Sequence, residues 1–404
     1  MATQWGGHLK ARQSLTRPGD ATVYRLVGTG TAVDGDANLR LKNTTRFGYA
    51  LELEAHYEAW LSGGDTRRRQ QRLLRLNPVA TARLPATGAD LDARRLFDLT
   101  AVVSDRSDHI LYHRLDRLSV AFRSSRGSLR LGRQDLTWGN GMIFNPLDLF
   151  NPFAPTDVVR DYKTGDDMAV VQAYLPDGGD LQVLYVPRRP TPGADPDWDA
   201  SSVAAKLHRF AGDIEFDLVA ARHYRDTVLG GGLLGDLGEA AWRLDAVWTV
   251  PGGDLDARSF LSFVVNLDYS WTWRGRNWYG LVEYHHNDLG TTDYGRALYE
   301  PRIRDRLRRG ELFGLGRDYL ALQLRWEVHP LVNLYLAPIT NLDGPSGLVQ
   351  PYLMWDVTGS LRATAGAVAH WGAAGTEYGG YRVVGTPFEA APSDSAYAML
   401  TWFF

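Results

Sequence analysis

Hydrophobic and polar residues alternate with a period of two over many long segments of the chain. In the segment 318–328, Leu322 and Leu324 lie on one face, whereas Arg325 and Glu327 lie on the other. Successive side chains of a β-strand point to opposite faces, so this pattern predicts strands with one apolar and one polar face. The same alternation occurs in 7–12, 51–58, 214–221, 239–249 and 265–273.

The length of these segments favours a membrane-spanning sheet. Many run for about 10–14 residues, beyond the usual length of strands in soluble proteins. No run of about 18 apolar residues predicts a transmembrane helix, and no helical layer is predicted to cover so many apolar faces. We therefore predict an all-β fold, a transmembrane antiparallel up-and-down β-barrel that forms one domain over residues 1–404.

Short and long connections alternate along the chain, as outer-membrane barrels require. The predicted short turns are 124–127, 176–179, 211–213, 274–277, 328–330 and 357–360. The predicted long connections are 63–108, 139–166, 189–200, 290–316 and 373–392. This order predicts about 18 strands, with a glycine-rich strand around 226–236, and 16 strands as the alternative.

Aromatic residues gather near the short turns. Trp271, Trp278, Trp326 and Trp355 lie within a few residues of these turns, and the chain ends in the aromatic segment 402–404. Aromatic rings prefer the boundary between membrane and water, so we expect an aromatic girdle at the periplasmic rim.

Composition narrows the possible functions. The 404 residues include no cysteine, and the formal net charge is −3. Disulfides and thiolate metal sites are excluded, and a nucleic-acid partner is not predicted. The start at Met1 shows no signal-peptide pattern, so we expect a mature, processed chain. We expect no cofactor and no metal.

The chain resembles the β-barrels of the Gram-negative outer membrane. Its aromatic end, Trp402-Phe403-Phe404, is similar to the terminal strand that the barrel-assembly machinery recognises. The segment 131–141 and the following Asn145-Pro146-Leu147-Asp148 resemble the alginate-export type of barrel and related porin-like proteobacterial proteins. The resemblance implies an outer-membrane location, contact with outer-membrane lipid and lipopolysaccharide, and assembly by that machinery.

Charged residues dominate the predicted inward face, because a charge that faces lipid is costly. The predicted cationic pore-lining residues are Lys10, Arg12, Arg40, Lys42, Arg117, Arg123, Arg130, Lys206, Arg243, Arg325 and Arg362. The predicted anionic ones are Glu52, Glu54, Glu58, Glu215, Asp217, Asp245, Asp268, Glu283, Glu327 and Asp356. The near balance is compatible with a ladder of salt bridges that stiffens the wall, or with a selective path.

The connection 139–167 is unusually apolar for a loop and must pack against something. We expect it to fold into the barrel as a constriction or plug; the alternative is a packed extracellular cap. The candidate constriction residues are Asn145, Asp148, Asp157, Arg160, Asp161, Lys163, Asp166 and Asp167.

The arginine-rich segment 295–313 is compatible with a short helix, because Ile303 and Leu307 are four residues apart. It is interpreted either as a solvated basic loop or as a surface for lipopolysaccharide or a polyanion. Glu283 and His285 share a predicted face, but two groups are too few for a metal site, and no catalytic motif is present. We therefore predict no enzymatic activity.

Two functions follow from these patterns. The first is an outer-membrane pore for small polar or ionic solutes or for an extended polymer. The alternative is a plugged structural barrel in a larger envelope complex for export or electron transfer, which would need a periplasmic or surface partner.

Overall fold

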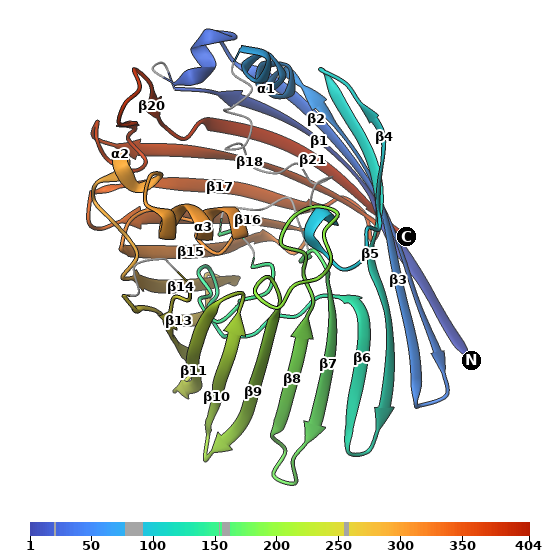
Figure 1. The fold of residues 1–404 in the computed structure, drawn as a ribbon. Coiled ribbons are helices and arrows are strands. Elements are labelled where there is room, and N and C mark those ends of the chain that lie inside the picture. Colours follow the sequence, from blue (N-terminus) through green and yellow to red (C-terminus); the bar gives the residue numbers. More distant parts are fainter. Residues whose placement is uncertain (20–21, 77–91, 153, 156–161, 254–257) are drawn as a thin grey trace.

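The polypeptide closes into a β-barrel in a computed structural model that describes residues 1–19, 22–76, 92–152, 154–155, 162–253 and 258–404 (Figure 1). Within these residues, 18 antiparallel strands form the wall, as predicted. They are β1 (Ala2–Arg17), β2 (Ala32–Phe47), β3 (Leu51–Gly64), β5 (His109–Ser124), β6 (Gly127–Gln134), β7 (Asp166–Tyr174), β8 (Asp180–Val186), β9 (Ser202–Ala211), β10 (Ile214–His223), β11 (Asp226–Leu237), β12 (Ala240–Val250), β13 (Phe260–Trp273), β14 (Arg276–Asn287), β15 (Asp318–His329), β16 (Val332–Asn341), β17 (Ser346–Asp356), β18 (Leu361–Gly372) and β21 (Asp394–Phe403).

The barrel closes where its first and last strands pair. β1 and β21 are antiparallel neighbours, with His8 opposite Phe403 and Arg17 opposite Asp394. Closure removes the free edges that an open sheet would leave, so the backbone polar groups of the wall are satisfied inside the membrane.

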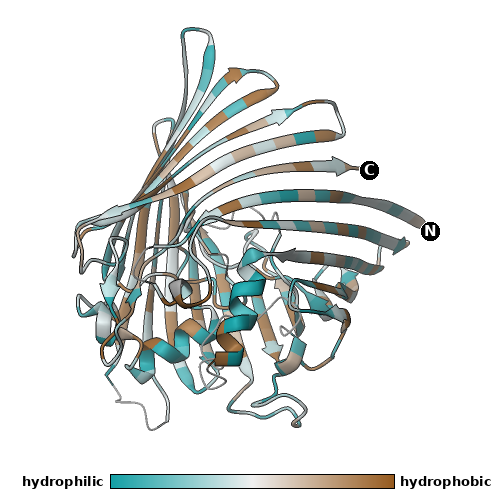
Figure 2. Ribbon diagram, turned by 90° about the horizontal axis from the view of Figure 1, so that it is seen from above, coloured by the Kyte–Doolittle hydropathy of each residue, from teal (hydrophilic) through white to brown (hydrophobic). Residues whose placement is uncertain are grey.

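The predicted alternation of faces is confirmed. On β15, Leu322 and Leu324 are 42% and 37% exposed on the outer surface, whereas Ala321, which faces the barrel interior, is fully buried. Figure 2 shows hydrophobic and hydrophilic residues alternating along the strands. Next to the short turns, Trp271, Trp278 and Trp326 stack across β13, β14 and β15, with ring centroids 6.1 and 5.2 Å apart.

Additional elements lie in the connections at the opposite, extracellular end. They are η1 (Val23–Leu26), α1 (Asp65–Leu76), β4 (Thr100–Asp105), α2 (Tyr294–Ala297), α3 (Pro301–Arg309), β19 (Tyr381–Arg382) and β20 (Glu389–Ala390). The helix expected in 295–313 is present, whereas α1 and β4 lie in the predicted connection 63–108, where no element was expected. None of the described helices is long and apolar enough to cross a membrane.

Candidate functional site: the barrel interior

The connection between β6 and β7 enters the barrel and is held there by two carboxylates of the wall. Asp245 on β12 accepts hydrogen bonds from the backbone amides of residues 140 and 141, at 2.5 and 2.9 Å. Glu283 on β14 accepts from the amides of residues 142–144, at 2.8, 3.1 and 2.6 Å. Five consecutive amides of an irregular segment are thus satisfied without secondary structure, as buried backbone groups require.

The glycine-rich strand β11 makes room for this segment. A Cβ atom at Gly232 would lie 2.5 Å from Asp245 Oδ1 and 2.9 Å from Asn140 Nδ2, and one at Gly230 would lie 2.6 Å from the Leu147 side chain. Real Cβ atoms do not approach other atoms so closely. The glycines that marked β11 in the sequence therefore allow the inserted segment to lie directly against the wall.

The underside of the inserted segment is an apolar core. Trp138, Leu147 and Phe150 are almost completely buried, and the Trp138 and Phe150 rings meet edge to face. They pack on inward residues of β7–β12: Met168, Leu184, Val186, Ala204, Val219, Ala221, Val228 and Val247. The apolar loop residues thus find their partners inside the barrel, while the role of this segment as a constriction stays a prediction.

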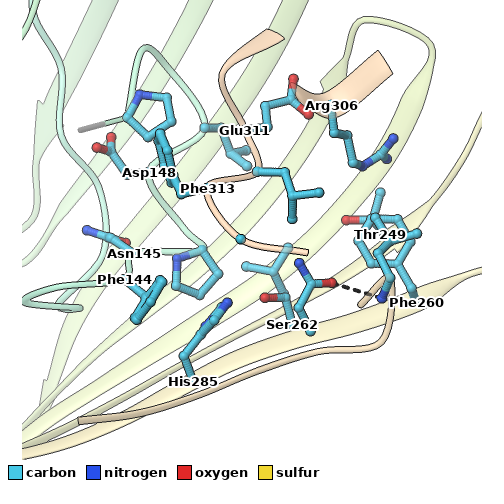
Figure 3. Close-up of a pocket in the computed structure, with 18 of the residues that line it drawn as sticks. Phe144, Asn145, Asp148, Thr249, Phe260, Ser262, His285, Arg306, Glu311 and Phe313 are labelled. Atoms are coloured by element: carbon cyan, nitrogen blue, oxygen red, sulfur yellow. Dashed lines mark hydrogen bonds between the residues drawn. The ribbon is translucent and has the colours of Figure 1, made fainter. Parts of the chain in front are cut away.

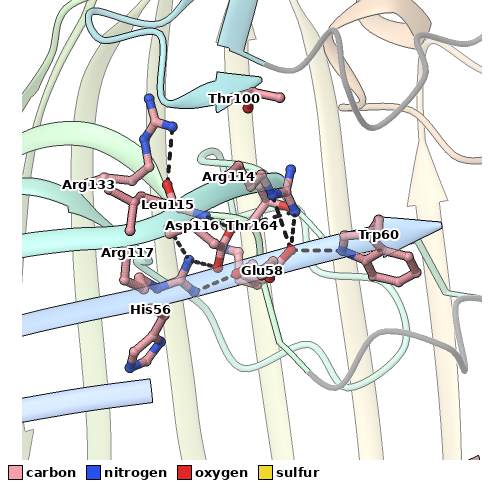
Figure 4. Close-up of polar contacts among 12 residues, drawn as sticks. His56, Glu58, Trp60, Thr100, Arg114, Leu115, Asp116, Arg117, Arg133 and Thr164 are labelled. Carbon is pink, nitrogen blue, oxygen red and sulfur yellow. Dashed lines mark hydrogen bonds and ion pairs between the residues drawn. The ribbon is translucent and has the colours of Figure 1, made fainter. Parts of the chain in front are cut away.

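A network of buried ion pairs lies on the wall formed by β2, β3 and β5 (Figure 4). Glu58 binds Arg114 at 3.0 Å and also pairs with Arg40, which in turn binds Asp116 at 2.8 Å. Arg117 also binds Asp116, at 2.7 Å. All five side chains are at most 4% exposed, so each charge depends on its partners rather than on water.

A β-bulge explains why strict alternation missed part of this network. The register between β3 and β5 shifts at His56 and Tyr57, and the extra residue on β5 lets Asp116 and Arg117 both point inward. The predicted pore-lining residues include Arg117 but neither Arg114 nor Asp116. The sequence did contain a signal, because charged residues occupy both even and odd positions of β5. A charged side chain that faces lipid is costly, so such a strand must change its alternation at some point.

A second group of buried ion pairs includes residues of the connections, which no periodic pattern identifies. Arg133 at the end of β6 binds Asp92 at 2.7 Å and Asp167 at 2.9 Å. Asp166 pairs with Arg188 at 2.5 Å and lies 3.7 Å from Arg95. These pairs tie the connections after β3 and β8 to the adjoining ends of β6 and β7.

The candidate constriction residues are held within the same packing. Lys163 Nζ lies 2.5 Å from Asp148 Oδ1 and also donates to the Leu136 carbonyl oxygen. Burial raises the pKa of Asp148 to about 6 and lowers the pKa of Lys163, so desolvation outweighs their mutual attraction. Asp166 and Asp167 are buried and Asn145 is half-buried, whereas Asp157, Arg160 and Asp161 lie outside the described residues. Contact of a solute with any of them stays a prediction.

The predicted pore-lining residues differ in their exposure. The buried ones are Lys10, Arg40, Glu52, Glu58, Arg117, Asp217, Asp245 and Glu283. The half-buried ones are Arg12, Glu54, Arg123, Arg130, Lys206, Glu215, Arg243, Asp268, Arg325, Glu327, Asp356 and Arg362, and Lys42 is exposed. Asp245 and Glu283 hold the inserted segment, so their carboxylates face backbone amides.

Partly open charge remains toward the short turns. Arg123 binds Glu52 at 2.8 Å, and Arg362 binds Asp356 at 2.7 Å. The arginine side chains are 35% and 37% exposed, in contrast to the buried pairs near the inserted segment. The ion pairs are therefore buried near the inserted segment and partly exposed toward the short turns.

Helix α3 turns two of its arginines inward. Arg306 and Arg309 both bind Asp226 on β11, at 2.9 and 3.3 Å, and Arg306 is buried. The interpretation of 295–313 as a solvated basic loop is therefore wrong for these two residues. Alternation could not reveal this, because the partner lies about 80 residues earlier in the chain.

A small cavity separates the inserted segment from the residues that follow α3 (Figure 3). It has a volume of about 100 Å³, and its walls include Phe144, His285, Arg306 and Tyr319. The His285 ring stacks on Phe144, with centroids 4.6 Å apart, and does not pair with Glu283. Among the described residues, no three His, Asp or Glu side chains are grouped so that they could hold a metal ion.

Comparisons with known proteins match this architecture. No protein-family model matches the chain, and no curated protein is similar in sequence. OccAB4 of Acinetobacter baumannii is 8% identical with a TM-score of 0.54, over 100% of this chain and 98% of that chain. The Escherichia coli protein Wzi is 11% identical with a TM-score of 0.55, over 98% and 84%.

OccD3 of Pseudomonas aeruginosa is 9% identical with a TM-score of 0.51, over 99% and 91% of the two chains. The fold is that of a Gram-negative outer-membrane β-barrel. The apolar outer surface suits this fold, because lipid covers the outside of such a barrel. The predicted outer-membrane location agrees with this fold.

Proposed function

We propose that this outer-membrane barrel is a channel for small polar or ionic solutes, narrowed by the segment inserted between β6 and β7. The observation that carries the proposal is the anchoring of five consecutive amides by Asp245 and Glu283 inside the wall. Barrels of this strand number enclose more space than wall side chains fill, and they usually hold an aqueous lumen. Wall carboxylates that fix an irregular segment across that lumen set its width.

The charges toward the periplasmic end support polar solutes. Half-exposed arginines, including Arg123 and Arg130, lie near Glu52 and Glu54 at distances of 2.8 to 4.0 Å. Charges of both signs within a partly open interior stabilise hydrated or ionic solutes and repel apolar ones. A wider opening of the same channel would admit an extended polymer.

The second candidate is a plugged structural barrel, which would act in a larger envelope complex. Two groups of buried ion pairs favour it, one around Arg40 and one from Asp92 to Arg188. The second group holds the connections after β3 and β8 against the wall. A rigid end suits a scaffold as well as a channel.

Single-channel recording in a planar bilayer separates the two. The wild-type protein is compared with a variant in which residues 140–149 are replaced by a short Gly-Ser linker, and with Asp268→Asn as the control. We expect discrete steps for the wild type and larger steps for the linker variant. Silence of the wild type with steps in the linker variant would establish the plugged barrel, and silence of both would contradict a channel.

A further inference from the structure

A basic helix lies at the extracellular rim, outside the ion-pair network. Helix α1 begins at Asp65, directly after β3 ends at Gly64, and its 12 residues include five arginines. None of its residues is buried. An exposed helix with this much positive charge is either fastened to the protein or available to an anionic partner.

Three of the arginines fasten the helix. They donate to backbone carbonyl oxygens of neighbouring segments at 2.8, 2.9 and 3.2 Å: Arg67 to Arg106, Arg69 to Gly30 and Arg72 to Val27. Arg67 also forms an ion pair with Asp105. The carbonyl oxygens that Arg69 and Arg72 contact carry no full negative charge, so they do not neutralise these two arginines.

The other two arginines form one side of a groove. Arg68 and Arg75 are seven residues apart, which places them on the same helix face. With Arg106 and residues 107–109 of the β4–β5 turn, they line an open groove of about 730 Å³. Arg68 binds Asp65 at 2.8 Å, whereas the guanidinium groups of Arg75 and Arg106 have no hydrogen bond or ion pair within the described chain.

Exposed apolar residues lie close in the chain to the residues of this groove. Leu76, at the end of α1, is 67% exposed, and Val103 on β4 is 62% exposed. Leu61, an outward residue of β3, is four residues before the helix, roughly 13 Å along an extended strand. The groove therefore lies at the level where the outer surface changes from apolar wall to polar connections, where lipid headgroups are found.

We propose that the groove formed by Arg68, Arg75 and Arg106 binds a phosphate of lipid A, the membrane-embedded part of lipopolysaccharide. A guanidinium group binds phosphate through two parallel hydrogen bonds, and two of the three groups lack a partner among the residues that the structure describes. The acid of the groove, Asp108, is paired with His109 at 3.0 Å. The adjoining apolar side chains favour a lipid over free phosphate. This inference rests on the outer-membrane location and is independent of conduction.

The test measures the binding of bisphosphorylated lipid A to the full chain in detergent by native mass spectrometry. Arg75→Gln with Arg106→Gln is compared with Arg304→Gln and Arg308→Gln, which remove two exposed arginines of α3 at the same end of the barrel. We expect the first pair to weaken binding at least tenfold, and the second to change it less than twofold. Unchanged heat-modified migration on gels shows that both variants are folded.

Three further arms define the ligand. Dephosphorylated lipid A should bind at least tenfold more weakly, and inorganic phosphate or phosphatidylglycerol should not displace lipid A at equal concentration. Equal loss in both arginine pairs would overturn the proposal, because it would indicate general attraction between charges. Binding that is insensitive to dephosphorylation, or efficient displacement by inorganic phosphate, would overturn it as well.

Discussion

Replacement of Glu283 by alanine is expected to release the inserted segment. The carboxylate accepts hydrogen bonds from three consecutive amides, those of residues 142–144. A typical intramolecular hydrogen bond contributes about 1 kcal/mol net, so three contribute about 3 kcal/mol. Because 1.4 kcal/mol corresponds to a tenfold change in an equilibrium constant, Glu283→Ala should increase the released population roughly 100-fold.

The absence of cysteine from the sequence allows a clean assay. Leu147 is fully buried on the underside of the inserted segment, so a cysteine at this position should react slowly with a bulky, water-soluble maleimide. In the Leu147→Cys background, Glu283→Ala should accelerate labelling by up to the same factor of about 100. Single-channel conductance of the same protein should rise or fluctuate between levels.

The matched control is Asp268→Ala, which removes an inward carboxylate of the neighbouring strand β13. Asp268 pairs with Arg243 on the wall and has no hydrogen bond to the described part of the inserted segment. Labelling should stay within a few-fold of the background. Equal labelling rates for Glu283→Ala and the background, with unchanged conductance, would refute the reasoning that this carboxylate anchors the segment.

Three other substitutions probe separate contacts. Gly232→Ala places a methyl group 2.5 Å from Asp245 Oδ1 and should accelerate labelling of Cys-substituted Leu147, whereas Gly359→Ala, with open space around it, should not. Lys163→Met leaves the Asp148 carboxyl, whose pKa burial already raises to about 6, without its partner. A carboxyl group with a raised pKa stabilises the folded state at low pH, and this contribution is lost as pH rises through about 6. Lys163→Met should therefore lower Tm more at pH 8 than at pH 5. An equal decrease in Tm at both pH values would contradict this sign. Glu58→Gln leaves the buried Arg40 and Arg114 with Asp116 as their remaining carboxylate partner. It should lower the free energy of unfolding by about 3–5 kcal/mol in urea titrations, and a loss below about 1 kcal/mol would show that Asp116 and water replace the pair.

The sequence by itself determined the wall of this protein. Lipid outside and polar groups inside impose a period of two on every spanning strand, so Leu322, Leu324 and Arg325 could be assigned to their faces without a structure. Turn residues and the glycine-rich segment 226–236 gave the number of strands. These features are local, because each depends on neighbouring residues of one segment.

Only the tertiary structure decided what fills the barrel. Glu283 appeared in the sequence as one inward charge among many, and its partners are amides about 140 residues earlier in the chain. Asp116 is absent from the predicted pore-lining residues, because a bulge shifts the alternation between two strands that the sequence does not place side by side. Arg306 of helix α3 forms an ion pair with Asp226 of β11, which lies about 80 residues earlier in the chain. Alternation records which side of the wall a residue faces, but closure of the barrel determines which residues meet inside it.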